Sequence, residues 1–510
     1  MLELTATDVL LGTTTLLVVW RILFRERGLD HIPTVGYSHP ILSWISCIVY
    51  LFGARNSLRE GYRLFPGGIF KIPTFDGWTV VANGAHHVDD IRKATEEQMS
   101  AMESTAAFKY TLGPRILENP FHIEVIRKAL TRNIGSRYQD IYDEVVRAYT
   151  EAIPQCTDDW VSITAYKLQV DVICRVSSRY FVGQPLCKCF FQLVDCRGLH
   201  SYSTGDNPEF RDLCERATAE IFKGRFIRVF PAFLRPFASR LLTDIHNLRA
   251  QMADFLQPII DYRLEQETLH GGEWPDRPND LITWLIDGAR ASGEEISAAD
   301  FSSRLLFTSF GAIHTSSAAF NSALYQLCLN PDDAKELREE VERVTQEEGW
   351  TKAALGKMYK MDSYLRESQR MHSIGILSLG RTLFKDFTFS DGTFVPEGSR
   401  LAVNLDARHY DENLYSDPEV FNGFRHVRTD GEPQPLVATP TLEYHAFGHG
   451  RPACPGRFFA ITELKTMLAH LVMNYDVKLE DDVYPSKLMM EANAIPNMSA
   501  KVLFRQRQKV

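Results

Sequence analysis

A long segment without proline constrains the fold of this chain more than any other feature. Between Ser297 and Pro331 the residues follow a helical pattern, and Ser297 with Asp300 three residues later resembles a capping box. At 1.5 Å per residue, a helix here would extend about 45 Å, which is long enough to cross a whole domain. Its middle, "FGAIHTSSAAF", contains small and polar residues. This patch either packs tightly against another helix or lets a ligand approach the backbone.

The remainder of the sequence predicts a mainly α fold with a small β-sheet region. Helical patterns dominate, and strand-like alternation is confined to residues 68–75, 77–83 and 387–405. Hydrophobic residues make up 45% of the 510 residues and charged residues 24%, which is ordinary for a globular protein. The formal net charge of −9 argues against nucleic acid as a partner. Nine cysteines without repeated C-x-x-C pairs favour a reducing compartment.

The N-terminus predicts a membrane anchor over residues 1–27. Residues 9–24 are mostly apolar, acidic residues precede them, and arginines crowd their far end. This asymmetry predicts that the rest of the chain faces the cytosol, whereas a cleaved signal peptide would carry its basic residues first. A proline-containing linker is expected over residues 28–40 and the main domain over residues 41–510. The apolar stretch at residues 41–52 belongs either to the core or to the membrane surface.

Cys454 lies in the loop "FGHGRPACPG", directly before an amphipathic helical run. Gly450 and Gly456 bracket it and permit backbone conformations, or a close ligand approach, that other residues prevent. Pro455 suits a first helical turn, and the exposed N–H groups at a helix start favour a thiolate. Such a thiolate could serve as a nucleophile or as a metal ligand.

This loop resembles the heme-binding loop of the cytochrome P-450 family. In that family an aromatic residue, two glycines and the cysteine have this spacing, which falls here on Phe447, Gly448, Gly450 and Cys454, with Gly456 following. The resemblance implies the cytochrome P-450 fold and a heme b whose axial iron ligand is Cys454. Other landmarks of the family follow in the expected order along nearly the whole chain.

The segment "ESQR", from Glu367 to Arg370, looks like the E-x-x-R helix of the family. There the glutamate and arginine form a buried network with an arginine of a later loop, which would be Arg425 here. Other E-x-x-R matches occur in the chain, but Glu367 follows the long helix and precedes the strand-like region, as the family requires. The later loop departs from the family pattern, because Gly423 replaces a proline and His426 replaces an aromatic residue.

The segment "GAIHTS", residues 311–316, resembles the oxygen-activating segment of the family. Thr315 occupies the position of the threonine that directs a proton during oxygen activation, and His314 occupies the position of the usual acid. A neutral histidine can relay protons but does not hold negative charge as a carboxylate does. This variant, like the "HGR" before the cysteine, is similar to fungal members that work in secondary metabolism, often on terpenoids.

Heme carboxylates need cations, and the resemblance implies four candidates. Arg381 in "LSLGRTLF" matches an arginine that the family uses for a heme propionate. Arg451 lies one position earlier than the cation that often precedes the cysteine. In "HIEVIRKALTRN", His122 replaces the tryptophan of the family's W-x-x-x-R pattern, and Arg127 lies one residue late.

The implied activity is that of a heme-thiolate monooxygenase that hydroxylates or further oxidises a lipophilic small molecule with O2. The 510 residues contain no dinucleotide fingerprint or flavin domain, so electrons from NADPH would arrive through a separate cytochrome P-450 reductase, with cytochrome b5 as a further candidate partner. Residues 128, 132, 457 and 465 are basic and would form the docking patch for the reductase. The expected location is the endoplasmic reticulum membrane, with a single span, lipid contact and a cytosolic catalytic domain.

Two other functions remain open at this point. Some members of the family are isomerases or dehydratases that need no electron donor, although Thr315 counts against this function. The other function is a membrane-anchored heme or lipid binder without catalysis. NADPH consumption in the presence of reductase and substrate distinguishes the three.

Overall fold

The computed structural model of the chain describes residues 28–39, 42–74, 77–103, 108–183, 208–227, 230, 233–272, 274 and 276–508. The expected membrane anchor at residues 1–27 lies outside these residues. Among the helices within the described ranges, none combines the length and apolar character needed to cross a membrane.

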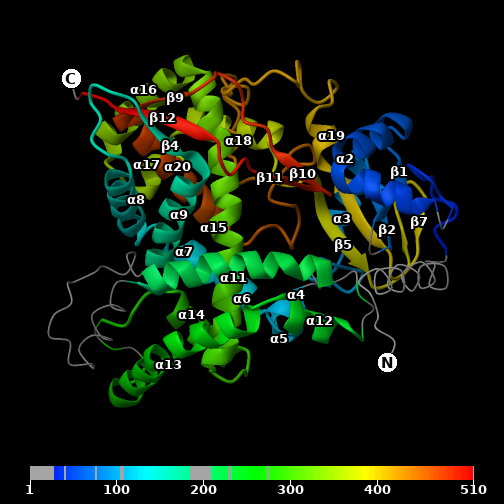
Figure 1. Cartoon of the computed structure of the whole chain (residues 1–510), viewed down its shortest axis with the longest axis horizontal. Helices are drawn as coiled ribbons and strands as arrows, with labels where there is room; N and C mark the ends of the chain where they lie inside the picture. Colours follow the sequence, from blue (N-terminus) through cyan, green and yellow to red (C-terminus); the bar gives the residue numbers. More distant parts are fainter. Residues whose placement is uncertain are drawn as a thin grey trace, which may run out of the picture.

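Helices make up most of the described chain, as expected from the sequence (Figure 1). They are α2 (Ser43–Leu64), α3 (Ala85–Lys93), α4 (Phe108–Thr111), α5 (Arg115–Glu118), α6 (Phe121–Val125), the π-helical turn η2 (Ile126–Leu130), α7 (Thr131–Asn133), α8 (Tyr138–Ala152), α9 (Ala165–Val182), α11 (Pro208–Ile227), α12 (Arg235–Leu242), α13 (Ile245–His270), α14 (Leu281–Ala291), α15 (Ala298–Leu329), α16 (Pro331–Glu348), α17 (Lys352–Gly356), α18 (Tyr359–Met371), α19 (Leu405–His409) and α20 (Arg457–Asn474).

The strands are short, and the largest of the four sheets in the described chain lies beside α2 and α3. They are β1 (Ile69–Thr74), β2 (Gly77–Ala82), β3 (Met99–Ser100), β4 (Val161–Thr164), β5 (Leu377–Leu383), β6 (Phe387–Thr388), β7 (Phe394–Val395), β8 (Arg400–Asn404), β9 (Tyr475–Leu479), β10 (Leu488–Met490), β11 (Asn493–Ile495) and β12 (Lys501–Gln506).

The long helix predicted between Ser297 and Pro331 is present as α15. It has 32 residues, which corresponds to about 48 Å, and it runs through the middle of the molecule between the helical part and the sheet (Figure 1). The predicted capping box is wrong, because the Ser297 side chain makes no cap hydrogen bond and Asp300 instead pairs with Arg304 at 2.6 Å. Most of α15 is buried, and it packs against α9, α11, α13, α18 and α20. Burial of this helix therefore holds the helical part together.

The main sheet has five strands in the order β1-β2-β8-β5-β3. Strands β2 and β8 pair in parallel, and the other neighbours pair antiparallel. The strands expected at residues 68–75 and 77–83 are β1 and β2. The region 387–405 forms the small β6–β7 hairpin, with Gly392 in its turn at φ +87°, and then β8, which leaves the hairpin to join the main sheet. The expectation that strands are confined to these regions is wrong, because β3, β4, β5 and β9 to β12 lie outside them.

The expected linker packs against the main sheet over its described residues 28–39. The N–H of Val35 donates to the Lys71 carbonyl at 3.0 Å, and the N–H of Lys71 donates to the Pro33 carbonyl at 2.8 Å. Leu29 and Ile32 are buried because their apolar side chains enter the same cluster as β2 and β8. These residues therefore extend the folded domain toward the N-terminus.

Lys487 is a half-buried lysine between α15 and the start of β10. Its Nζ donates to the Ser322 hydroxyl and to the His372 carbonyl, each at 3.0 Å. No carboxylate forms an ion pair with it in the described part of the chain. Burial lowers the pKa of Lys487 to about 7, and the charge of Arg55 acts in the same direction.

This depressed pKa predicts a pH-dependent contribution to stability. Between about pH 7 and the ordinary lysine pKa near 10.4, the unfolded chain holds a proton that the folded chain does not, so stability rises with pH across this window. We expect Lys487→Met to remove that dependence. The Tm of the variant minus that of the wild-type protein should be most positive at pH 7 and should shrink toward pH 10. Lys501→Met, at an exposed position, is the control. A Tm difference for Lys487→Met that does not change with pH would contradict the prediction.

Candidate active site

The loop that carries Cys454 is held by its own backbone. The N–H of Cys454 donates to the Phe447 carbonyl at 2.8 Å, and the carbonyl of Cys454 accepts from Nη1 of Arg457 at 2.9 Å. Gly448 and Gly450 have φ of +71° and +76°, a region that favours glycine. At Gly450 a Cβ would also lie 2.5 Å from the carbonyl oxygen of Arg92 in α3. The two glycines of the motif are therefore required by backbone conformation and by contact with α3.

The environment of the Cys454 sulfur combines burial with backbone donors. Burial raises the pKa of the Cys454 thiol, while hydrogen bonds from the backbone N–H groups of Gly456 and Arg457 oppose this rise. Helix α20 begins at Arg457 with Gly456 as its N-cap, so Pro455 precedes the helix and does not occupy its first turn, contrary to our expectation. The donors that favour a thiolate are nevertheless in place, and a bound metal ion would complete the deprotonation.

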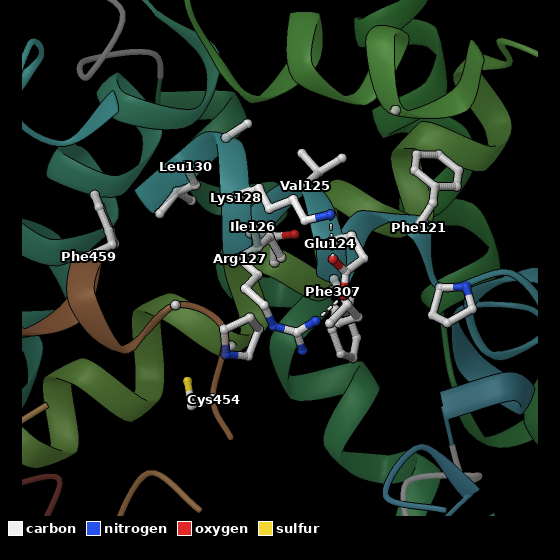
Figure 2. Close-up of a pocket in the computed structure, with 18 of the residues that line it drawn as sticks. Phe121, Glu124, Val125, Ile126, Arg127, Lys128, Leu130, Phe307, Cys454 and Phe459 are labelled. Atoms are coloured by element: carbon white, nitrogen blue, oxygen red, sulfur yellow. Dashed lines mark hydrogen bonds and ion pairs between the residues drawn. The ribbon is translucent and has the colours of Figure 1, made fainter. Parts of the chain in front are cut away.

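A cavity of about 1160 Å³ lies beside the sulfur. Figure 2 shows Cys454, Phe307, Phe459 and the segment from Phe121 to Leu130 among the residues that line it. Helix α15 contributes the opposite wall with Phe307, Thr308, Gly311, Ala312, Thr315 and Ser316. A Cβ at Gly311 would meet no atom within 4 Å, so the small patch of α15 opens onto space rather than packing against another helix.

Thr315 faces this cavity, whereas His314 points away from it. The exposed Thr315 hydroxyl donates to the Gly311 carbonyl at 2.5 Å. Nδ1 of His314 lies 3.0 Å from the hydroxyl of Tyr166 in α9, and its buried Nε2 has no hydrogen-bond partner among the residues that the structure describes. Burial lowers the pKa of His314 to about 4, so the imidazole is neutral. The structure does not bring His314 and Thr315 together at the cavity.

Arg381 is a buried cation in β5 without a carboxylate partner. Only 5% of it is exposed, and in the described residues its hydrogen bond is from Nη1 to the carbonyl of its neighbour Gly380. Burial lowers the pKa of Arg381, and the charge of Glu96, which lines the cavity, opposes this. A buried charge without a counter-ion is costly, so this position suits an anionic group of a ligand.

The other candidate cations lie at different places around the loop. Arg127 lies on η2, lines the cavity, pairs with Glu124 and donates from Nη2 to the Arg451 carbonyl at 3.2 Å. Arg451 is exposed and also lines the cavity. His122 does not line it. Instead its Nδ1 lies 2.8 Å from Nη1 of the buried Arg304, and burial lowers the pKa of His122 to about 3.

These residues fit a heme with a cysteine ligand. The sulfur borders the cavity, and the wall that α15 contributes is open at Gly311. Arg381 does not line the cavity, but no carboxylate of the described residues pairs with it, and a heme carboxylate would supply that partner. Arg127 and Arg451 line the cavity and could also pair with such a carboxylate. The His122 side chain already contacts Arg304 and does not line the cavity, so the structure supports it as a heme contact less than it supports Arg127 and Arg451.

The sequence motifs did not identify several residues of the cavity wall. Phe307, Gly311 and Thr315 recur every four residues along α15, so helical periodicity from Thr315 could have found Phe307. The resemblance had already singled out Arg127 in the Phe121 to Leu130 segment, but the contribution of its apolar neighbours follows from tertiary packing and carries no such local signal.

A buried network near the site brings Glu367, Arg370 and Arg425 together. Glu367 accepts from Nε and Nη2 of Arg370 at 2.8 and 2.9 Å and from Nε of Arg425 at 2.9 Å. Nε2 of His426, which replaces the aromatic residue of the motif, lies 3.3 Å from Glu367. Burial raises the pKa of Glu367, but these partners outweigh burial and hold the pKa well below its ordinary value.

The departure from the motif at Gly423 has a steric explanation. A Cβ there would lie 2.7 Å from Oδ2 of Asp333 and 2.7 Å from the ring of Tyr364. The backbone of this loop therefore approaches α16 and α18 too closely for a proline ring.

Comparison with known proteins finds the same family along nearly the whole chain. A model of the cytochrome P450 family matches residues 47–504. The chain is 40% identical over 504 residues to cytochrome P450 monooxygenase 151 of Postia placenta, covering 96% of this chain and 97% of that protein. It is 29% identical to the ent-kaurene oxidase of Gibberella intermedia, over 93% of this chain and 88% of that protein. A retinoic-acid-bound cyanobacterial CYP120A1 has the same fold, with a TM-score of 0.69 at 18% identity over 93% of this chain and 99% of that one.

The Glu367 network predicts a large effect of a nearly isosteric change. Glu367→Gln removes the only charge that neutralises Arg370 and Arg425 within the triad, and we expect the protein to lose about 3–5 kcal/mol of stability. Denaturant unfolding of the heme-loaded protein measures this loss. Glu60→Gln is the matched control, because Glu60 and Arg63 form an exposed E-x-x-R pair. An equally small loss in both variants would contradict a structural role for the buried network.

Proposed function

Because this chain belongs to the cytochrome P450 family and is an oxygen-incorporating oxidoreductase, we propose that it oxidises a lipophilic small molecule of terpenoid type. The family implies a heme, O2 and electrons from a reductase. We propose heme b and NADPH as the specific cofactor and electron source. The observation that carries the proposal is the apolar cavity bounded by the Cys454 sulfur and by Thr315.

When bound, the heme supplies oxygen activation, which a thiolate ligand promotes by donating electron density. The residues of this chain do the rest. Cys454 would hold the iron through its sulfur, and the N–H groups of Gly456 and Arg457 would stabilise the negative charge of that sulfur. The hydroxyl of Thr315 donates to Gly311, so its oxygen is free to accept a hydrogen bond from a water in the cavity and to direct a proton toward the reacting oxygen.

The cavity wall supports a lipophilic substrate. Aromatic and aliphatic side chains line it, and they exclude water from the reaction while they bind an apolar molecule. They include Phe121, Val125, Phe181, Trp284 and Phe307. One similar protein is an ent-kaurene oxidase, and ent-kaurene is a terpenoid hydrocarbon. This similarity supports the terpenoid class without identifying the substrate.

We further propose that the surface on the cysteine side docks an NADPH–cytochrome P-450 reductase, with cytochrome b5 as a second candidate. Lys128 is 78% exposed and, like Arg127, pairs with Glu124. Arg132 lies nearby on α7. Lys465 does not belong to this surface, which corrects our expectation. Its side chain is 4% exposed, and its Nζ donates to Oδ2 of Asp362 at 2.6 Å.

The location that we propose is the endoplasmic reticulum membrane, with residues 1–27 as the anchor and the catalytic domain in the cytosol. Exposed apolar side chains on two helices support additional lipid contact. In α2, Phe52 is 68% exposed and Val49 is 56% exposed. In α12, Leu241 is 86% exposed and Phe237 is 72% exposed.

The assignment of Cys454 as the iron ligand predicts a spectral loss. The reduced protein with carbon monoxide should show the red-shifted Soret band of a heme thiolate, and Cys454→Ala should abolish it. Cys156→Ala, at another buried cysteine, is the control and should retain the band. A Cys454→Ala protein that keeps the band would refute the assignment.

The position of Thr315 predicts uncoupling. Thr315→Ala should leave heme content and substrate binding nearly intact, yet lower the product formed per NADPH consumed by about tenfold or more, with hydrogen peroxide as the by-product. Thr315→Ser should retain much of the coupling, because it keeps the hydroxyl. The measurement uses saturating reductase and a substrate found by spectral binding. Unchanged coupling in Thr315→Ala, or turnover without NADPH, would favour the isomerase function instead.

His314→Ala tests whether the neighbouring histidine contributes. The side chain faces Tyr166 and not the cavity, so we expect coupling near that of the wild-type protein. The double change with Thr315→Ala should then match Thr315→Ala alone. Stronger uncoupling in the double variant would show that His314 supplies a parallel proton route.

The proposed membrane association predicts two separable contributions. Deletion of residues 1–27 should loosen membrane binding while heme incorporation is preserved. Adding Val49→Ser and Phe52→Ser to the deletion should lower the remaining binding to lipid vesicles. Residual binding that the two serines do not change would show that α2 does not contact lipid.

A further inference from the structure

Two adjacent histidines and an aspartate converge at a point outside the cavity. His86 and His87 lie in the first turn of α3, and Asp391 lies in the turn between β6 and β7. In the described chain, this is the one group of three histidine, cysteine or acidic residues whose possible ligand atoms all lie within 4.8 Å of one another. None of the three lines the cavity beside Cys454.

The three possible ligand atoms form a compact triangle. Nε2 of His87 lies 2.9 Å from Oδ2 of Asp391, Nε2 of His86 lies 3.3 Å from the same oxygen, and the two nitrogens lie 3.1 Å apart. Zinc binds imidazole nitrogens and carboxylate oxygens at about 2.0–2.2 Å, and at tetrahedral angles such ligand atoms lie about 3.3 Å from one another. The triangle therefore already resembles one face of a zinc tetrahedron.

Protons alone satisfy these three contacts poorly. The Gly84 N–H donates to Nδ1 of His87 at 3.3 Å, so the proton of a neutral His87 sits on Nε2 and is donated to Asp391. A neutral His86 brings at most one more proton to the triangle. One of the three contacts must then place two N–H groups or two lone pairs face to face. A divalent cation would turn all three contacts into coordinate bonds, with the His87 proton moving to Nδ1 in place of the long Gly84 hydrogen bond.

The surroundings of the triangle hold two of its members in position. His87 is fully buried, and its ring packs edge-on against Phe389 at a centroid distance of 5.0 Å. Oδ1 of Asp391 accepts from the N–H of Thr393 at 2.8 Å, which orients the carboxylate. The side chain of His86 is 43% exposed, so solvent reaches a fourth coordination position.

We propose that His86, His87 and Asp391 bind a divalent transition-metal ion of the zinc class, with water at the fourth position. Two imidazoles and one carboxylate suit such an ion better than magnesium or calcium, which prefer oxygen ligands. The ion would join residues 304 positions apart in the sequence and clamp α3 to the β6–β7 turn. The other end of α3 presents the Arg92 carbonyl to Gly450, so the clamped helix also supports the cysteine loop.

The experiment measures zinc bound per chain by equilibrium dialysis of the heme-loaded full chain after treatment with a chelator. We expect the wild-type protein to bind one ion, and His86→Ala and Asp391→Asn each to bind it at least about 10–100-fold more weakly. His31→Ala is the matched control, since His31 is exposed and contacts the Phe394 carbonyl on the same hairpin but lies outside the triangle. Far-UV circular dichroism and the carbon monoxide spectrum verify that each variant is folded and retains heme.

A thermal measurement adds a second criterion. Zinc should raise the Tm of the wild-type protein and of His31→Ala in a concentration-dependent manner, and at the same zinc concentration it should raise the Tm of His86→Ala much less. Because His86 is partly exposed, its removal should not prevent folding. Equal zinc stoichiometry and equal Tm shifts in all four proteins would overturn the site. Loss in His86→Ala with full retention in Asp391→Asn would also overturn the three-ligand site.

Discussion

The position of the Cys454 sulfur depends on backbone contacts more than on side chains. The Cys454 N–H is bound to the Phe447 carbonyl, and the sulfur receives two N–H groups from the start of α20. Gly450 lets α3 approach until the Arg92 carbonyl nearly touches the loop. The loop is therefore packed between α3 and α20. Helix α15 lines the cavity with glycine and alanine, and these small residues leave room beside the sulfur. A change in any of these backbone positions would move the sulfur relative to α15.

Buried charges in this protein fall into two physical classes. Glu367 is surrounded by cations, and its negative charge is fully compensated within the fold. Arg381, which is buried, and Lys487, which is half-buried, are cations without a carboxylate partner among the described residues, and burial lowers the pKa of each. The first class stabilises the folded state as it stands. The second leaves charge uncompensated, and at Arg381, close to Glu96 at the cavity edge, an anionic ligand group would relieve that cost.

Local sequence predicted the parts of the fold that local physics determines. The absence of proline predicted α15, and alternating apolar residues predicted β1 and β2. Strand β5 was not predicted because its ends are set by pairing with β3, which lies far away in sequence, and with β8, which follows only after the β6–β7 hairpin. The cysteine loop could be identified because two of its glycines stand at positions where the backbone has a positive φ. The direction of the His314 side chain could not be predicted, because the pattern "GAIHTS" does not reveal that the ring contacts Tyr166 of α9. Lys465 looked like a surface charge because sequence does not report its pairing with Asp362.

The π-helical turn η2 explains a mismatch that sequence comparison left open. Arg127 falls one residue late for the W-x-x-x-R pattern, and Ile126–Leu130, the segment that contains it, is π-helical. Hydrogen bonds from residue i to i+5 enclose one residue more than those of an α-helix, so this turn departs from the regular spacing on which the pattern depends. Arg127 then lines the cavity and donates to the Arg451 carbonyl, which joins this helix to the cysteine loop. The irregular turn therefore carries a cation that lines the cavity and also contacts the cysteine loop.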